Sequence, residues 1–184
     1  MKKMKRQDIK FDEPKFKELV LYISEKCEDD PDFGAVKLNK ILFYTDFLAY
    51  AMFGKPVTGS EYIALEHGPA PKMLAPIREE MKEKGEIAIR ERDRFGKVQV
   101  RVVPLREPDL SVFSPDEIAL VDKLIMGFCG INATVLSELS HLQIGWQIAS
   151  PKEVIPYQTV FLANEELLPF DRQRAKVLAQ TYSW

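Results

Sequence analysis

The sequence predicts a mainly helical α+β fold: a compact single helical domain with one small β-hairpin. Three observations predict this class. Apolar residues recur at spacings of three and four between residues 36 and 53, as on the buried face of an amphipathic helix. Residues 87–89 and 98–102 instead alternate apolar and polar side chains, as β-strands do. Ser114 and Glu117 can form a capping box, with Pro115 at the first position of the following helix.

The chain of 184 residues is long enough for one domain with a substantial core. Its hydrophobic fraction of 46% and charged fraction of 29% are ordinary for a globular protein. We expect a flexible N-terminal tail over residues 1–12 and a single domain over residues 13–184. The end of that domain is predicted to be a C-terminal helical extension, with a last helix over residues 171–182.

The first predicted helix follows Asp12, which can cap it, and contains Pro14 in its first turn. Its apolar stripe consists of Phe16, Leu19, Val20 and Ile23.

The strongest predicted helix covers residues 36–53 and ends before Gly54 and Pro56. One face carries a core-like stripe of Leu38, Ile41, Leu42, Thr45, Leu48 and Met52. A neighbouring face combines basic and aromatic residues: Lys37, Lys40, Tyr44 and Phe47. Two interpretations of this second face remain open. The aromatic residues can belong to the core beside solvated lysines, or the face can be free to bind a partner.

The middle of the chain is predicted to contain an extended segment over residues 59–67 and a turn over residues 68–71, where Pro69 lies. A helix over residues 72–84 ends at Gly85, and residues 93–96 form the loop of the predicted hairpin. The helix after Ser114 is expected to bury Ile118, Val121, Leu124, Ile125 and Phe128. Asn132 can cap one further helix, which extends to about His141.

Composition and charge bear on the compartment and on partners. The formal net charge of −2 argues against an overall preference for nucleic acid or for an anionic membrane. No apolar run approaches the roughly 18 residues of a membrane span. The basic N-terminus is followed by polar residues where a signal peptide would have its apolar core. These features predict a cytoplasmic protein with no membrane association.

The potential catalytic and metal-binding residues favour a protein that is not an enzyme and has no cofactor. The two histidines, His67 and His141, and the two cysteines, Cys27 and Cys129, have no neighbours at chelating spacing. Cys129 ends an apolar helix, where a buried and inert thiol is expected. No pair of carboxylates stands out as a general acid and base.

A DNA-binding regulator is the alternative function. A helix followed by a hairpin is the shape of a wing in winged-helix proteins, and six basic residues occur between Arg90 and Arg106 against two acidic ones. The helix that would enter the groove carries Glu79, Glu80 and Glu83, whose charges would oppose a polyanion. A solvated hairpin is therefore the simpler interpretation.

Several short motifs occur together in a defined order. The segment KLNKILFY at residues 37–44 is followed by GKPVTGSEY at residues 54–62 and by HGP at residues 67–69. Near the far end, LSELSH at residues 136–141 precedes Trp146. This arrangement, over residues 15–150, resembles the Panacea antitoxin domain family, also described as SocA-like or GepA-like. Ser140 and Gly145 stand where that family usually has Thr and Pro.

The resemblance implies a phage-associated or bacterial antitoxin of a toxin–antitoxin system. Such a protein neutralises a cognate toxin by direct binding, and in one branch it delivers the toxin to an AAA+ protease. The candidate partner-binding residues are the motif positions Lys37, Lys40, Tyr44, Phe47, His67 and Pro69. The identity of the toxin and the oligomeric state are left open.

Overall fold

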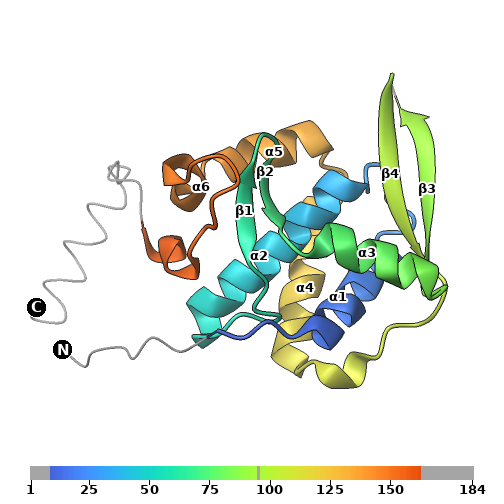
Figure 1. Ribbon diagram of the computed structural model, residues 1–184, viewed down its shortest axis with the longest axis horizontal. Helices are drawn as coiled ribbons and strands as arrows, with labels where there is room; N and C mark the ends of the chain where they lie inside the picture. Colours follow the sequence, from blue (N-terminus) through green and yellow to red (C-terminus); the bar gives the residue numbers. More distant parts are fainter. Residues whose placement is uncertain (1–8, 95, 163–184) are drawn as a thin grey trace, which may run out of the picture.

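The computed structural model describes residues 9–94 and 96–162 (Figure 1). Its helices are α1 (Glu13–Lys26), α2 (Ala35–Phe53), α3 (Leu74–Glu83), α4 (Pro115–Phe128), α5 (Ala133–His141) and α6 (Ile144–Ile148). Its strands are β1 (Tyr62–Leu65), β2 (Gly68–Pro71), β3 (Ile87–Arg94) and β4 (Lys97–Pro104), and two short 3-10 helices cover Leu110–Val112 and Tyr157–Phe161. Helix α2 is the central element, since it packs against α1, α4, α5, β2 and the second 3-10 helix. The predicted α+β class is confirmed.

The capping residues begin the helices as their sequences predict. The Asp12 carboxylate accepts a hydrogen bond from the Lys15 backbone N–H at the start of α1. Both hydrogen bonds of the capping box join Ser114 and Glu117 at the start of α4, and Asn132 caps α5. Such caps satisfy N–H groups that have no partner inside the helix.

A second two-stranded sheet corrects the prediction of one hairpin. Strands β1 and β2 are antiparallel and are joined by a two-residue turn, and Gly68 after that turn has a φ of 93°. The pairs Glu61–Lys72 and Leu65–Gly68 fix the register, and the Lys72 N–H donates to the Glu61 carbonyl. In this register Pro69 and Pro71 occupy the alternate positions that donate no hydrogen bond to β1. The two prolines, which suggested only a turn, are therefore compatible with a strand.

Residues 9–12 differ from the expected flexible tail. Ile9 and Phe11 pack against the core, and the Asp12 backbone N–H donates to the Thr58 carbonyl at 2.8 Å. The start of the chain was expected to be a tail because it is polar and charged, but its two apolar side chains have tertiary partners. Residues 1–8 and the predicted last helix over residues 171–182 lie outside the described residues.

Two side chains predicted to be buried lie on the surface. Met52 is 62% exposed because the last turn of α2 extends into solvent, where Ala51 and Phe53 are exposed as well. Cys129 is exposed at the end of α4, whereas Cys27 is buried. The stripe of α4 is also narrower than predicted, since Val121 is buried while Ile118 and Leu124 are half-buried.

No single described helix is long and apolar enough to cross a membrane. Helices α4 and α5 reach that length and composition only when they are counted together, and they are bent at 115° to each other.

Candidate partner-binding site

The turn between β1 and β2 is held by side chains that donate to its backbone carbonyls. Lys40 Nζ on α2 donates to the His67 carbonyl at 2.5 Å and to the Pro69 carbonyl at 3.2 Å. Trp146 Nε1 on α6 donates to the Leu65 carbonyl at 3.0 Å. His141 Nε2 on α5 lies 3.1 Å from the Glu66 carbonyl, so this nitrogen carries the proton. Three helices therefore fix the main chain at residues 65–67 and 69.

Lys40 is the most deeply placed of these donors. Its side chain is 1% exposed, and no ion pair joins it to any described residue. Burial lowers the pKa of its ammonium group to about 7. Among the described residues its hydrogen-bond acceptors are the two backbone carbonyls, which ties the position of the turn closely to that of α2.

Gly68 allows the close approach that these hydrogen bonds need. A Cβ atom at this position would clash with Ser140 Oγ and with Lys40 Nζ. The positive φ of Gly68 is a second reason why an L side chain would be strained here. Close to this contact, the ring of His141 stacks on Trp146 with centroids 4.0 Å apart, so the two donors on α5 and α6 orient each other.

A buried polar cluster holds the other end of β1. The Asp46 carboxylate on α2 accepts hydrogen bonds from the Thr58 backbone N–H at 2.6 Å, from Thr58 Oγ1 at 2.5 Å and from the Tyr62 hydroxyl at 2.7 Å. Asp46 is completely buried, and burial raises the pKa of its carboxyl above the ordinary value. The cluster attaches the segment before β1 to the middle of α2.

The side chains at the tip of the turn point outward although its main chain is held from inside. Leu65 is 37% exposed, and Glu66 and His67 are exposed too. A mostly apolar cavity of about 420 Å³ adjoins them, with Val36 and Asn39 of α2 in its wall. We call the three tip side chains and this cavity the turn surface. Its arrangement suits the binding of a partner side chain beside a rigid loop.

The comparison with protein families decides what kind of domain this is. A family model described as "Antitoxin SocA-like, Panacea domain" matches residues 38–147, more than half of the chain. The chain belongs to this family. No curated protein and no solved structure matches it. In the Panacea domain, the matched span begins in α2 and ends in α6, so it contains Lys40, His141, Trp146 and the turn that they hold.

Three predicted site residues on α2 of the Panacea domain are buried, which corrects the idea that the second face of this helix is free. Lys37 is 1% exposed; its Nζ donates to Asp30 at 2.6 Å and to the Phe128 carbonyl at 3.0 Å. Lys40 holds the turn, as described above. Phe47 is 3% exposed within an aromatic cluster whose members are Phe43, Tyr62 and Tyr157. The face was expected to be free because one apolar stripe is enough to seat a helix, but α2 is central and packs on several sides.

The remaining predicted residues divide between the core and the surface. Tyr44 is half-buried, with edge-to-face contacts to Phe43 and Phe128. Pro69 is buried, and only His67 is exposed at the turn surface. Lys40 lies close to both His67 and Pro69, and it contacts their carbonyls from inside.

Sequence reasoning did not select Leu65, Glu66, His141 or Trp146 as site residues. His141 and Trp146 belong to the motifs that carried the family resemblance, so their place in the motif could have identified them. Leu65 and Glu66 had no such signal, because exposure at a turn depends on which neighbours cover it.

Proposed function

We propose that this Panacea domain is an antitoxin that neutralises a cognate toxin by direct binding and without catalysis, and that the toxin contacts the turn surface. One observation carries the proposal. The motif side chains Lys40, His141 and Trp146 hold the main chain of one turn, the first of them buried and the other two half-buried, while the side chains of that turn remain outward. A loop that is ordered before binding loses less conformational entropy when a partner is bound.

The residue types at the turn surface support a protein partner. Leu65 offers an apolar contact beside an apolar cavity, and Glu66 and His67 add polar groups at its rim. An apolar centre with a polar border is the usual composition of a protein interface. Different side chains on the same held turn would suit different toxins.

The combined change Leu65→Asp and His67→Ala is expected to weaken toxin binding by at least about 2 kcal/mol, the scale of an interface hot spot. The probe is the product of a toxin-like reading frame beside this gene, titrated by calorimetry. Circular dichroism should show an unchanged fold, because both side chains are exposed. Growth rescue of cells that express the toxin should be lost in parallel. An unchanged affinity in the folded variant would place the toxin on another surface.

Delivery to an AAA+ protease is the second route of neutralisation that family membership suggests. The two routes differ in the lifetime of the toxin in cells. Blocking by direct binding leaves the toxin at a constant level after synthesis stops, whereas delivery shortens its half-life only when the protease is present.

The charges of the β3–β4 hairpin favour toxin binding over the DNA-binding alternative. Three of its basic residues have partners within the described part of the chain. Arg94 pairs with Asp32, and Arg106 pairs with Glu18 and Glu86. The Arg101 guanidinium donates to two carbonyls, those of Cys27 and Glu28. Cations engaged in this way have less capacity to replace counterions on phosphates.

Changing both Arg90 and Arg92 to Glu is therefore expected to leave toxin affinity unchanged within about 0.5 kcal/mol, as for most surface changes. Both residues are exposed on β3, away from the turn surface. Electrophoretic mobility shifts on the protein's own promoter, at low and high salt, complete the test. A specific, salt-dependent shift that this variant loses would establish the DNA-binding function instead.

A further inference from the structure

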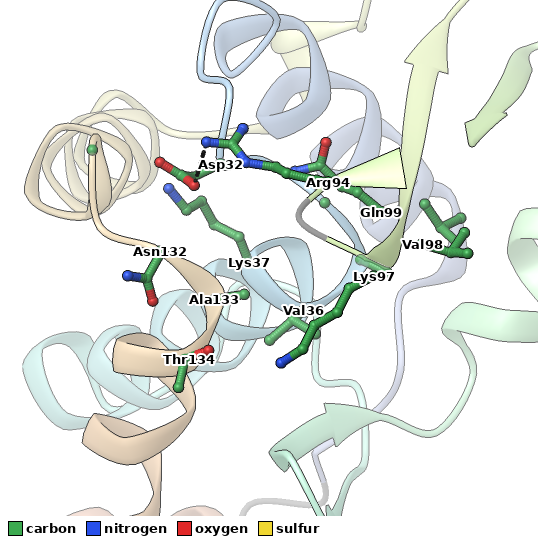
Figure 2. Close-up of a pocket in the computed structure, with 14 residues that line it drawn as sticks. Asp32, Val36, Lys37, Arg94, Lys97, Val98, Gln99, Asn132, Ala133 and Thr134 are labelled. Atoms are coloured by element: carbon green, nitrogen blue, oxygen red, sulfur yellow. Dashed lines mark ion pairs between the residues drawn. The ribbon is translucent and has the colours of Figure 1, made fainter. Parts of the chain in front are cut away.

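A second cavity lies beside the outer edge of strand β4. It has a volume of about 560 Å³ and is bounded by the first turn of α2, the start of α5 and β4 itself (Figure 2). Val98, Gln99 and Val100 form its β4 wall, while Val36 and Thr134 lie across from them. The turn surface does not include this β4 edge.

The register of the β3–β4 hairpin determines which backbone groups face outward. The Leu105 N–H donates to the Glu86 carbonyl, and in this register Glu86 is the partner of Leu105. Hydrogen-bonded pairs alternate along an antiparallel ladder, so β4 uses its odd-numbered residues to bond β3. The N–H and C=O groups of Val98 and Val100 therefore point away from β3. Pro104 is also even-numbered and has no N–H to donate, as expected for a position that does not bond β3.

The outward groups at Val98 and Val100 have no hydrogen bond to any residue between 9 and 162 that the structure describes. A Cβ atom at Gly34 would lie 3.4 Å from the Val100 carbonyl, so Gly34 packs against that carbonyl and the edge is open at Val98. Gln99 Nε2 donates to the Pro31 carbonyl at 3.1 Å and anchors the strand there. The result is a short, rigid and unpaired strand edge that opens into a cavity, a site suited to an added strand.

The charged side chains around this edge favour an acidic partner segment. Two of the three cationic groups in the cavity wall are already paired, Lys37 with Asp30 and Arg94 with Asp32. The charge that a partner can meet at this edge is therefore that of Lys97. Lys97 is exposed at the mouth and makes no ion pair with a described residue. Opposite charge on a partner would be steered to this mouth.

We propose that the β4 edge binds an extended segment of the toxin by strand addition, with an acidic residue of that segment beside Lys97. This inference rests on the proposed function and extends it. Val36 lines both cavities, so a toxin bound at the turn surface reaches the β4 edge along the first turn of α2. The outward N–H and C=O of Val98 and the outward N–H of Val100 supply the main-chain hydrogen bonds.

The test is a substitution that removes one outward backbone N–H and leaves the β3–β4 hydrogen bonds intact. Val98→Pro removes the N–H that faces the cavity, while Val98→Ala shortens the same side chain and retains the N–H. We expect toxin affinity to fall at least about tenfold in Val98→Pro and to stay within about twofold in Val98→Ala. Lys97→Glu should slow association, and the effect should diminish at high salt. In wild-type protein labelled with ¹⁵N-valine, the Val98 and Val100 amides should gain protection from hydrogen exchange when the toxin is added.

The outcomes separate this inference from the function on which it rests. If the wild-type protein binds the toxin and folded Val98→Pro binds it equally well, strand addition is wrong and the proposed function stands. If the valine amides stay unprotected in the complex, strand addition is likewise wrong. If the wild-type protein is a dimer that Val98→Pro converts to a monomer, the occupant of the edge is a second copy of this chain. If the wild-type protein binds no toxin, both proposals fail.

Discussion

Asp46→Ala is expected to lower the free energy of unfolding by about 3 kcal/mol or more, because three buried donors lose their acceptor. Those donors are the Thr58 backbone N–H, Thr58 Oγ1 and the Tyr62 hydroxyl, and only the last has a second acceptor, the Leu42 carbonyl. Ala is the better helix former, so local propensity would act in the opposite direction. Urea denaturation followed by circular dichroism measures the effect.

A matched variant shows how much of the loss comes from a single bond. Thr58→Val retains the shape of the side chain and removes only the Oγ1 donor, so we expect a loss of about 1–2 kcal/mol. Relief of the cost of burying the Asp46 carboxylate opposes these losses. An Asp46→Ala protein within about 1 kcal/mol of wild type would mean that this relief balances the lost hydrogen bonds.

Lys40→Met is expected to weaken toxin binding about a hundredfold, equivalent to roughly 3 kcal/mol. Met has a similar length and no charge, so the carbonyls of His67 and Pro69 lose the donor that holds the turn. The turn surface would then have to be ordered at the moment of binding. Lys72→Met is the control, because Lys72 lies beside the same hairpin in an exposed ion pair with Glu61. Titration calorimetry with the toxin compares the two variants.

The same variant tests the electrostatic environment of Lys40. Burial lowers its folded-state pKa to about 7, below the value of 10.5 for an exposed lysine, so the unfolded chain binds more protons between these two values. The free energy of unfolding of the wild-type protein should therefore rise between pH 7 and pH 9, by an amount on the order of 2 kcal/mol. Lys40→Met should lack this rise. A wild-type profile that is flat from pH 7 to pH 9 would contradict the lowered pKa.

From about pH 9 a second group, the Cys27 thiol, opposes this rise in stability. Burial raises the pKa of the Cys27 thiol to about 12, so in this range the folded chain retains a proton that the unfolded chain has lost. Stability due to Cys27 is then lost as the pH rises from about 9 towards 12. The stability that these two groups contribute together is greatest between their unfolded-state pKa values of 9.0 and 10.5.

Local signals in the sequence were sufficient for most of the fold. The capping residues Asp12, Ser114 and Asn132 begin α1, α4 and α5, and the alternating valines of β4 form a strand. These features depend on residues that are only a few positions apart in the sequence, so the local sequence is enough to identify them. The β1–β2 hairpin was missed because prolines normally argue against a strand. They are accommodated here only by the alternation of bonded and unbonded pairs across the ladder.

The candidate site depended on information that no local pattern contains. The motif residues identified the family and brought Lys40, His67 and Pro69 into one hypothesis. Their direction was not predictable: Lys40 points inward to carbonyls 27 and 29 residues away in sequence. A basic residue near aromatic residues on a helix normally suggests a surface. Burial of Lys37 requires Asp30 and the Phe128 carbonyl to be its partners, and the second of these lies 91 residues away.

By itself, the sequence determined the α+β class, the starts of the helices, the family and the set of motif residues, because periodicity, caps and motif order are properties of the linear chain. The tertiary structure alone decided what those residues do. It buried four of the six candidates and left Leu65 and Glu66 exposed at the turn. It also left the edge of β4 open at Val98. Exposure and hydrogen-bond satisfaction depend on segments far apart in sequence that meet only when α2 has packed on several sides.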